Sequence, residues 1–218
     1  MTKQEILTHV DHTLLKSFAT WDQIKMLCED AVKYNTASVC IPPCYVKRVH
    51  ETFPNLNICT VVGFPLGYET LAGKIADTVS CLNDGASEID MVINVCEVKN
   101  KNYEYVEEEI VKLRKVCQDK VLKVIIETCY LTEEEKVKLC EIVTNAGADY
   151  IKTSTGFGTG GATLSDILLF KENIGKNVRI KAAGGIRSVS SAEEYINAGA
   201  DRIGASAVLE EIKKEGTN

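Results

Sequence analysis

Short apolar runs alternate along the chain with longer amphipathic stretches. The runs have the length of buried strands, and the stretches between them have the pattern of helices with one apolar face. The pattern therefore predicts eight strands, each followed by a helical stretch. The expected strands are Val10–Thr13, Ala37–Ile41, Asn57–Val62, Ser87–Ile93, Val121–Glu127, Asp149–Thr153, Val178–Ala182 and Asp201–Gly204.

Regular strand–helix alternation predicts a parallel sheet. Eight such units in 218 residues favour an α/β fold with a single (β/α)8 TIM barrel, residues 1–218 forming one domain. A doubly wound open sheet is the alternative. Several helices are expected to begin at a capping box, a Ser or Thr followed three residues later by Glu or Gln. These pairs are Thr20 with Gln23, Thr132 with Glu135, and Ser190 with Glu193.

A weak internal repeat supports the barrel. Its copies are Lys33–Cys40, Asn83–Asp90, Asn145–Lys152 and Asn197–Gly204. Three copies carry a glycine where a helix would end with positive φ, and Asn35 takes that place in the remaining copy. The repeat therefore aligns expected strands two, four, six and eight.

Alternate strands of a barrel supply one layer of inward side chains. Near the C-terminal mouth this layer would contain the last residues of the four copies, Cys40, Asp90, Lys152 and Gly204. The strand residues that neighbour these inward positions are apolar. Because side chains alternate along a strand, these residues would face the helices. A lower layer would hold Glu88 and Arg202, whose charged groups should then lie within about 6 Å of each other.

Composition excludes several classes of protein. The net charge is −6 with no basic block, which argues against nucleic acid as a partner. No apolar run approaches about 20 residues and no signal region begins the chain, which argues against a membrane or secretion. The nine cysteines form no C-x-x-C pair, which favours reduced thiols and a cytoplasmic location. No H-E-x-x-H motif appears, so no metal is expected.

Two lysines mark the candidate chemistry. Lys152 ends an apolar strand and Lys181 has the same inward parity on the next one. Like charge and burial would lower an amine's pKa and make it a nucleophile toward carbonyls. Asp90 could then move protons, and Glu127 could orient or neutralise a lysine. The plainer alternative is a structural Lys152–Asp90 ion pair.

The loops after the last strands are candidates for binding a phosphate, since this face of a barrel often does so. Backbone N–H groups at a helix N-terminus hold an anion without a basic side chain. A G-x-G-x-x-G pattern at Gly156–Gly161 lacks the acidic partner that dinucleotide binding requires. The residues expected at the phosphate site are Thr155, Gly156, Gly184, Gly185, Gly204 and Ser206.

The segment Tyr150-Ile-Lys-Thr-Ser-Thr-Gly-Phe157 resembles the deoxyribose-phosphate aldolase family. Further similar segments follow in order along the whole chain. They include Val10–Thr13, Ala37–Pro42, Val61–Gly67, Glu88–Asn94, Lys123–Thr128, Lys181–Arg187 and Gly204–Ser206.

This resemblance implies reversible cleavage of 2-deoxy-D-ribose 5-phosphate to acetaldehyde and D-glyceraldehyde 3-phosphate. It matches Lys152 to the Schiff-base lysine and Lys181 to the lysine that lowers the nucleophile's pKa. Asp90 matches the proton-transfer aspartate, while Asp11 and Cys40 match substrate-pocket positions. No metal or organic cofactor is implied beyond the covalent imine.

Phe157 stands where some members carry a lysine that approaches the phosphate, which would leave its recognition to backbone N–H groups and Ser206. Barrels of this kind often associate, so a dimer or tetramer is an open expectation. The competing interpretations are another Schiff-base aldolase or transaldolase, a non-catalytic phosphosugar-binding barrel, and a nicotinamide-binding protein.

Overall fold

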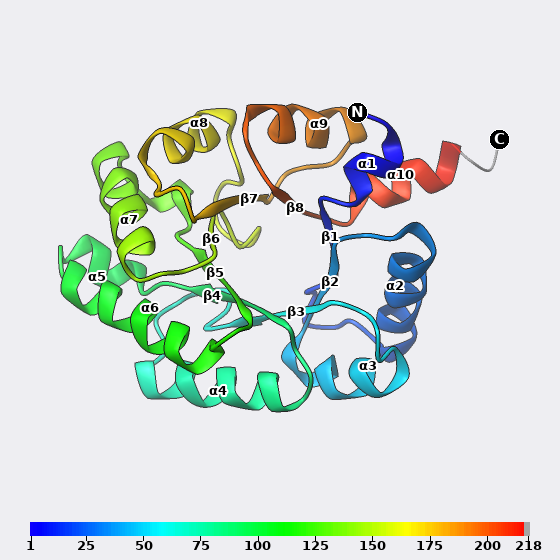
Figure 1. The fold of residues 1–218 in the computed structure, drawn as a ribbon, viewed down its shortest axis with the longest axis horizontal. Helices are drawn as coiled ribbons and strands as arrows, with labels where there is room; N and C mark the ends of the chain where they lie inside the picture. The colour runs from blue at the N-terminus through cyan, green and yellow to red at the C-terminus, as the bar shows by residue number, and fades with distance from the viewer. Residues whose placement is uncertain (216–218) are drawn as a thin grey trace.

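The computed structural model describes residues 1–215. Eight parallel strands pair in sequence order and close into a barrel, with the last strand paired to the first, as the alternation predicted. Figure 1 shows the strands around the centre and the helices outside them. The strands are β1 (Val10–Thr13), β2 (Ser38–Ile41), β3 (Ile58–Val62), β4 (Glu88–Val92), β5 (Val121–Ile125), β6 (Tyr150–Lys152), β7 (Arg179–Ala183) and β8 (Arg202–Ala205).

Helices follow every strand and form the outer layer of the barrel. Short 3-10 turns, η1 (Pro43–Tyr45) and η2 (Thr128–Tyr130), follow β2 and β5. No helix among residues 1–215 is long and apolar enough to cross a membrane. The helices are α1 (Lys3–Leu7), α2 (Trp21–Tyr34), α3 (Val46–Thr52), α4 (Leu71–Asn83), α5 (Val95–Lys99), α6 (Tyr103–Cys117), α7 (Glu133–Asn145), α8 (Leu164–Asn173), α9 (Val189–Ala198) and α10 (Ala207–Glu215).

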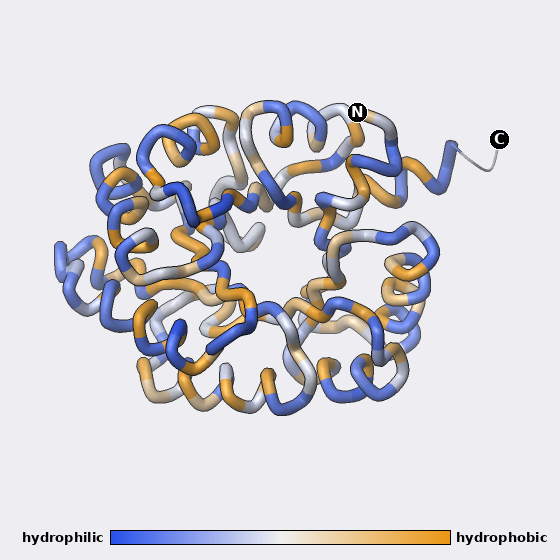
Figure 2. The backbone as a smooth tube through the Cα atoms, in the orientation of Figure 1, coloured by the Kyte–Doolittle hydropathy of each residue, from blue (hydrophilic) through white to orange (hydrophobic). Residues whose placement is uncertain are grey.

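The main hydrophobic core lies between the barrel and its helices. Apolar residues alternate with polar ones around each helix in Figure 2, as helices with one buried face require. The strand positions expected to face outward all belong to this core, which confirms the predicted alternation. They are Val39, Ile41, Ile89, Met91, Ile93, Ile151 and Ile203.

The expected left-handed residues before four of the strands are confirmed. Asn35 has φ 51°, while Gly85, Gly147 and Gly199 have φ of 108°, 74° and 127°. Glycine adopts a positive φ readily and asparagine is the next best residue, so the chain can leave the helix at these positions and enter the strand. The repeat found in the sequence is thus a repeated helix-to-strand turn.

Two local predictions were wrong. The capping box at Ser190 is not formed, because Ser188 is the N-cap of α9 and accepts from the Ser191 backbone N–H. Ser188 has the extended backbone that a cap requires, and Ser190 already lies inside the helix. The fifth strand ends at Ile125, so Glu127 lies beyond it, in the left-handed region with φ 54°. The capping boxes at Thr20 and Thr132 are confirmed.

Candidate active site

Charged side chains fill the inside of the barrel. Lys152 on β6 lies beside Lys181 on β7 in the strand register, and Asp90 on β4 lies beside Lys123 on β5. All four are almost completely buried. Lysines are rarely buried unless they are paired, so their partners define the arrangement.

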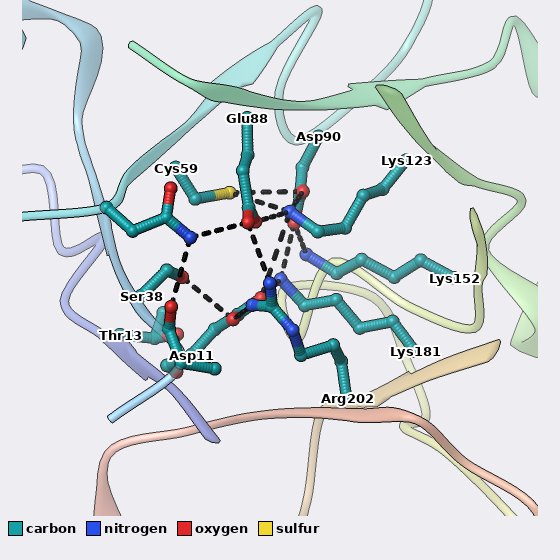
Figure 3. A network of polar contacts seen from close by, with 12 residues as sticks. Asp11, Thr13, Ser38, Cys59, Glu88, Asp90, Lys123, Lys152, Lys181 and Arg202 are labelled. Carbon is teal, nitrogen blue, oxygen red and sulfur yellow. Dashed lines mark hydrogen bonds and ion pairs between the residues drawn. The ribbon is translucent and has the colours of Figure 1, made fainter. Parts of the chain in front are cut away.

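Asp90 is the centre of this group (Figure 3). Its Oδ2 accepts from Lys152 Nζ at 2.7 Å and from Lys181 Nζ at 2.7 Å. Its Oδ1 accepts from Lys123 Nζ at 2.8 Å and from the Cys59 thiol at 3.1 Å. The structure therefore brings together the three residues that sequence reasoning proposed as catalytic.

A second group lies next to it, toward the N-terminal end of the barrel. Arg202 Nη2 is 2.7 Å from Glu88 Oε1, which confirms the predicted contact within the lower layer. Arg202 also pairs with Asp11, and Lys181 Nζ lies 2.5 Å from Asp11 Oδ2. Lys123 Nζ lies 2.5 Å from Glu88 Oε2 and so links the two groups.

The pKa values follow from this pairing. Burial alone would raise the pKa of Asp90, but Lys123, Lys152 and Lys181 outweigh it and hold that pKa well below its usual range. Asp11 behaves in the same way, with burial opposed by Lys181, Lys123 and Arg202, and its pKa is lowered. Both carboxyl groups are therefore ionised at neutral pH.

The pKa of Lys181 departs from the expectation that neighbouring lysines lower it. Burial does favour the neutral amine, but Asp11 and Asp90 outweigh burial and the repulsion by Lys123, and the pKa is raised. The two carboxylates within 2.7 Å of the Lys181 ammonium stabilise it more than the neighbouring Lys123 ammonium destabilises it. Lys181 is thus a fixed cation rather than a candidate nucleophile.

Sequence reasoning missed Lys123. Its ammonium is fully buried and contacts Glu88 and Asp90, and its pKa is raised well above the usual range because these carboxylates and Asp11 outweigh burial. The available signal was its inward parity on β5, in register with Asp90. The internal repeat does not extend to β5, and Lys123 lies at the third position of that strand and not at its C-terminal end.

A cavity of about 340 Å³ opens above the charged group at the C-terminal mouth. Lys152 lines it, whereas Asp90 and Lys181 lie beneath. The loops expected to bind phosphate also line it, together with one exposed cation that sequence reasoning did not single out, Arg187. The expected phosphate-site residues on its wall are Thr155, Gly156, Gly184, Gly185, Gly204 and Ser206.

Two of the glycines are required by the geometry of this wall. Gly184 has φ 86°, a conformation that other residues adopt only under strain. A Cβ at Gly204 would lie 2.9 Å from the Ala183 Cβ and 3.3 Å from the Lys181 Cε. The missing side chain at Gly204 therefore leaves room for Lys181 inside the barrel.

Two expected pocket residues, Asp11 and Cys40, lie off the cavity wall, and so does Glu127, which was expected beside a lysine. Asp11 is buried behind Lys181 and accepts from Ser38 Oγ at 2.7 Å. Cys40 is buried in a small cluster with Cys59 inside the barrel. Glu127 is bonded to Thr155 instead of a lysine, with its Oε2 accepting the Thr155 hydroxyl at 2.5 Å.

Phe157 also points away from the phosphate loops. It lines a smaller apolar cavity with Pro65 and Leu66, and its ring packs edge-on against Phe64 at 5.3 Å. Its place in the sequence therefore does not put an apolar ring in the main cavity. Arg187 lines that cavity as a charged group, so its lining is not limited to backbone donors and Ser206.

Known proteins are similar to this chain in both sequence and fold. A family model described as DeoC/LacD family aldolase matches residues 6–214. A deoxyribose-phosphate aldolase of Clostridium botulinum (strain Alaska E43 / Type E3) is 62% identical over 100% of this chain and 99% of its own. One of Clostridioides difficile (strain 630) is 56% identical over 98% of each chain.

Solved structures agree. An aldolase called QR15 superposes with a TM-score of 0.92 at 36% identity and 98% coverage of both chains. A deoxyribose phosphate aldolase of Aeropyrum pernix, described as a unique tetramer, gives a TM-score of 0.91 at 30% identity, covering 98% of this chain and 93% of its own. With its barrel, its buried lysines and its full-length match, this chain belongs to the DeoC/LacD family of aldolases.

Proposed function

We propose that residues 1–218 form one aldolase domain that reversibly cleaves 2-deoxy-D-ribose 5-phosphate to acetaldehyde and D-glyceraldehyde 3-phosphate. The observation that carries the proposal is the position of Lys152. Its amine lies between a cavity open to substrate and the buried Asp90 carboxylate, 2.7 Å away. The curated relatives of Clostridium botulinum and Clostridioides difficile carry the name of this activity.

The charge balance of the barrel favours Lys152 as the nucleophile. Four cations, namely Lys123, Lys152, Lys181 and Arg202, face three carboxylates, those of Asp11, Glu88 and Asp90. The loss of one proton would make this group neutral. Lys152 is the one amine of the three that lines the cavity, so it is the amine that can release its proton and attack the C1 aldehyde.

The attack first gives a carbinolamine, and loss of water then gives a protonated imine. The C2–C3 bond breaks, its electron pair moves into the imine to form a two-carbon enamine, and the C3 hydroxyl loses its proton as C3 becomes an aldehyde. Protonation of the enamine at C2 and hydrolysis then release acetaldehyde and regenerate Lys152. The proton transfers at the Lys152 nitrogen would take place beside the Asp90 carboxylate.

Asp90 is the proposed proton carrier. As long as three ammonium groups surround it, its lowered pKa makes it a poor base. Conversion of Lys152 into an uncharged carbinolamine removes one of these cations, and the proton affinity of Asp90 then rises. Lys181 and Lys123 remain charged and hold the carboxylate in place.

The phosphate would lie against the loops that follow β7 and β8. Gly184, Gly185 and Gly204 allow close approach to the backbone, and Ser206 precedes the N-terminus of α10. Oriented N–H groups and the helix dipole stabilise an anion there. Arg187 would add a charge from the edge of the cavity.

No metal or organic cofactor takes part in the proposed reaction, since the imine itself accepts the electrons. Assembly as a dimer or tetramer remains a proposal, supported by the tetramer described for the Aeropyrum pernix relative. A cytoplasmic location is also proposed, and the nine free cysteines support it. Light scattering of the purified chain would measure its assembly.

Product analysis tests the proposed activity. NMR of the chain with 2-deoxyribose 5-phosphate should show acetaldehyde and glyceraldehyde 3-phosphate, and the Lys152→Ala variant should show neither. A different pair of aldehydes would indicate another Schiff-base aldolase. Binding of the sugar phosphate without turnover would instead indicate a phosphosugar-binding barrel.

A further inference from the structure

Glu127 adopts a backbone conformation that its residue type seldom takes. It follows β5 by two residues, with φ 54° and ψ 67°, in the left-handed region. A non-glycine residue there is strained, and such strain persists where surrounding contacts enforce it. The Glu127 side chain is buried and lies against the segment after β6 that carries Thr155.

The contacts between the two residues are specific. The Thr155 hydroxyl donates to Glu127 Oε2 at 2.5 Å, and the Thr155 backbone N–H donates to Glu127 Oε1 at 3.2 Å. The Phe157 backbone N–H in turn donates to Thr155 Oγ1 at 3.0 Å. Burial raises the pKa of Glu127, and the Thr155 donors on its two oxygens oppose that rise by stabilising the carboxylate. Thr155 also lines the main cavity together with Lys152.

These bonds fix what the Thr155 hydroxyl can do. A hydroxyl has one proton to donate and two lone pairs that accept. Here the proton is given to Glu127 and one lone pair is taken by the Phe157 N–H. One lone pair is left to accept a further hydrogen bond, and Thr155 lines the main cavity. We infer that Glu127 is a positioning residue that holds Thr155 as an acceptor for a substrate hydroxyl group between the imine carbon and the phosphate.

The chemistry of the substrate selects the hydroxyl. The inference rests on the proposed function, under which the sugar has hydroxyls at C3 and C4. The C3 oxygen becomes a carbonyl during cleavage and then requires a donor, which Thr155 no longer has. The C4 hydroxyl keeps its proton throughout and suits an acceptor in every state. Thr155 and Glu127 therefore recognise the C4 hydroxyl, which is the 2-hydroxyl of glyceraldehyde 3-phosphate in the synthetic direction.

Replacing the carboxylate would reverse the role of Thr155. In Glu127→Gln the amide offers one acceptor oxygen for two Thr155 donors, and its NH2 group can only donate. If that NH2 group faces Thr155, it occupies the lone pair that the substrate would use. In Thr155→Val the acceptor is lost altogether, while Thr155→Ser retains it. Glu127→Gln and Thr155→Val should therefore change substrate choice in the same direction, and Thr155→Ser should not change it.

The experiment compares two acceptor aldehydes in synthesis with acetaldehyde. They are D-glyceraldehyde 3-phosphate and 3-oxopropyl phosphate, which lacks the 2-hydroxyl, and the readout is the ratio of their kcat/KM values. Glu127→Gln and Thr155→Val should each lower the ratio about tenfold, the effect of one lost hydrogen bond. Thr155→Ser and the exposed charge control Glu141→Gln should leave it unchanged. The double variant should fall no further than either single one.

A structural role alone would not change this ratio. Equal losses for both acceptors in Thr155→Val, or an unchanged ratio, would overturn the inference. If Glu127→Gln fails to fold, the comparison of Thr155→Val with Thr155→Ser still decides whether Thr155 acts as the acceptor. Failure of the wild-type chain to form product with either acceptor would reject the proposed function instead, so the two failures are distinguishable.

Discussion

Lys152 and Lys181 donate to the same oxygen of Asp90, each at 2.7 Å. One carboxylate oxygen thus touches both the proposed nucleophile and the fixed cation beside it. This sharing explains how Asp90 could respond to imine formation, since any change of charge on Lys152 acts on it directly. Lys181 meanwhile stays charged because Asp11 lies on its other side.

Asp90→Asn tests this coupling. The amide retains the shape of the side chain but can neither carry a negative charge nor accept a proton. We expect kcat for cleavage to fall by at least about 100-fold, the lower range for loss of general acid–base catalysis. Steady-state kinetics measures the effect. A rate close to that of the wild type would remove Asp90 from the proton transfers.

Lys123→Met tests the buried charge network. The variant leaves Glu88 and Asp90 with one fewer cation in a site without solvent, and removal of one partner of a buried ion pair costs about 3–5 kcal/mol. The free energy of unfolding from urea titration should fall by that amount. Lys99→Met is the matched control, because its pair with Glu135 is exposed on the lysine side and contributes at most about 1 kcal/mol.

The fold could be predicted from the sequence because barrel strands and helices impose simple periods. Parity along β4, β6 and β8 was enough to place Asp90, Lys152 and Arg202 inside the barrel. The capping of α9 by Ser188 was not predictable, because three serines lie within four residues there.

Contacts made outside regular strands were harder to predict. Glu127 was placed on a strand, but a left-handed backbone turns it toward Thr155. Asp11 was expected in the substrate pocket, yet its carboxylate is buried between Lys181 and Arg202. Strand period fixes which face a side chain is on. It does not fix which of several charged neighbours the side chain will contact.

The free energy of unfolding should depend on pH in the acid range because of the buried carboxylates of Asp11 and Asp90. The pKa values of Asp11 and Asp90 are lowered in the folded chain, so their contribution is complete above the unfolded-state pKa of about 3.9 and is lost as the pH falls through the lower folded values. The free energy of unfolding should therefore decrease steeply below about pH 4.

Asp11→Asn isolates one of these groups. Its slope of unfolding free energy against pH should be shallower than that of the wild type by about 1.4 kcal/mol per pH unit in this acid range. Urea unfolding followed by circular dichroism at several pH values measures both slopes. Identical slopes would show that Asp11 keeps its ordinary pKa in the folded chain.

Ser206→Asp tests the phosphate site. A carboxylate at the start of α10 would repel the phosphate and occupy the N–H groups proposed to bind it. The KM for 2-deoxyribose 5-phosphate should rise strongly, whereas the KM for free 2-deoxyribose should change little. Equal losses for both sugars would place the phosphate elsewhere. Ser165→Asp, at an exposed position on α8, controls for the added charge.

Borohydride reduction in the presence of 2-deoxyribose 5-phosphate, followed by intact mass and peptide mapping, tests the central claim most directly. We predict a stable adduct on Lys152 in the wild-type chain, and none in Lys152→Ala. An adduct on Lys181 would contradict the assignment of Lys181 as a fixed cation and exchange the two roles. Absence of any adduct, with turnover or binding measured in the same sample, would contradict the Schiff-base mechanism itself.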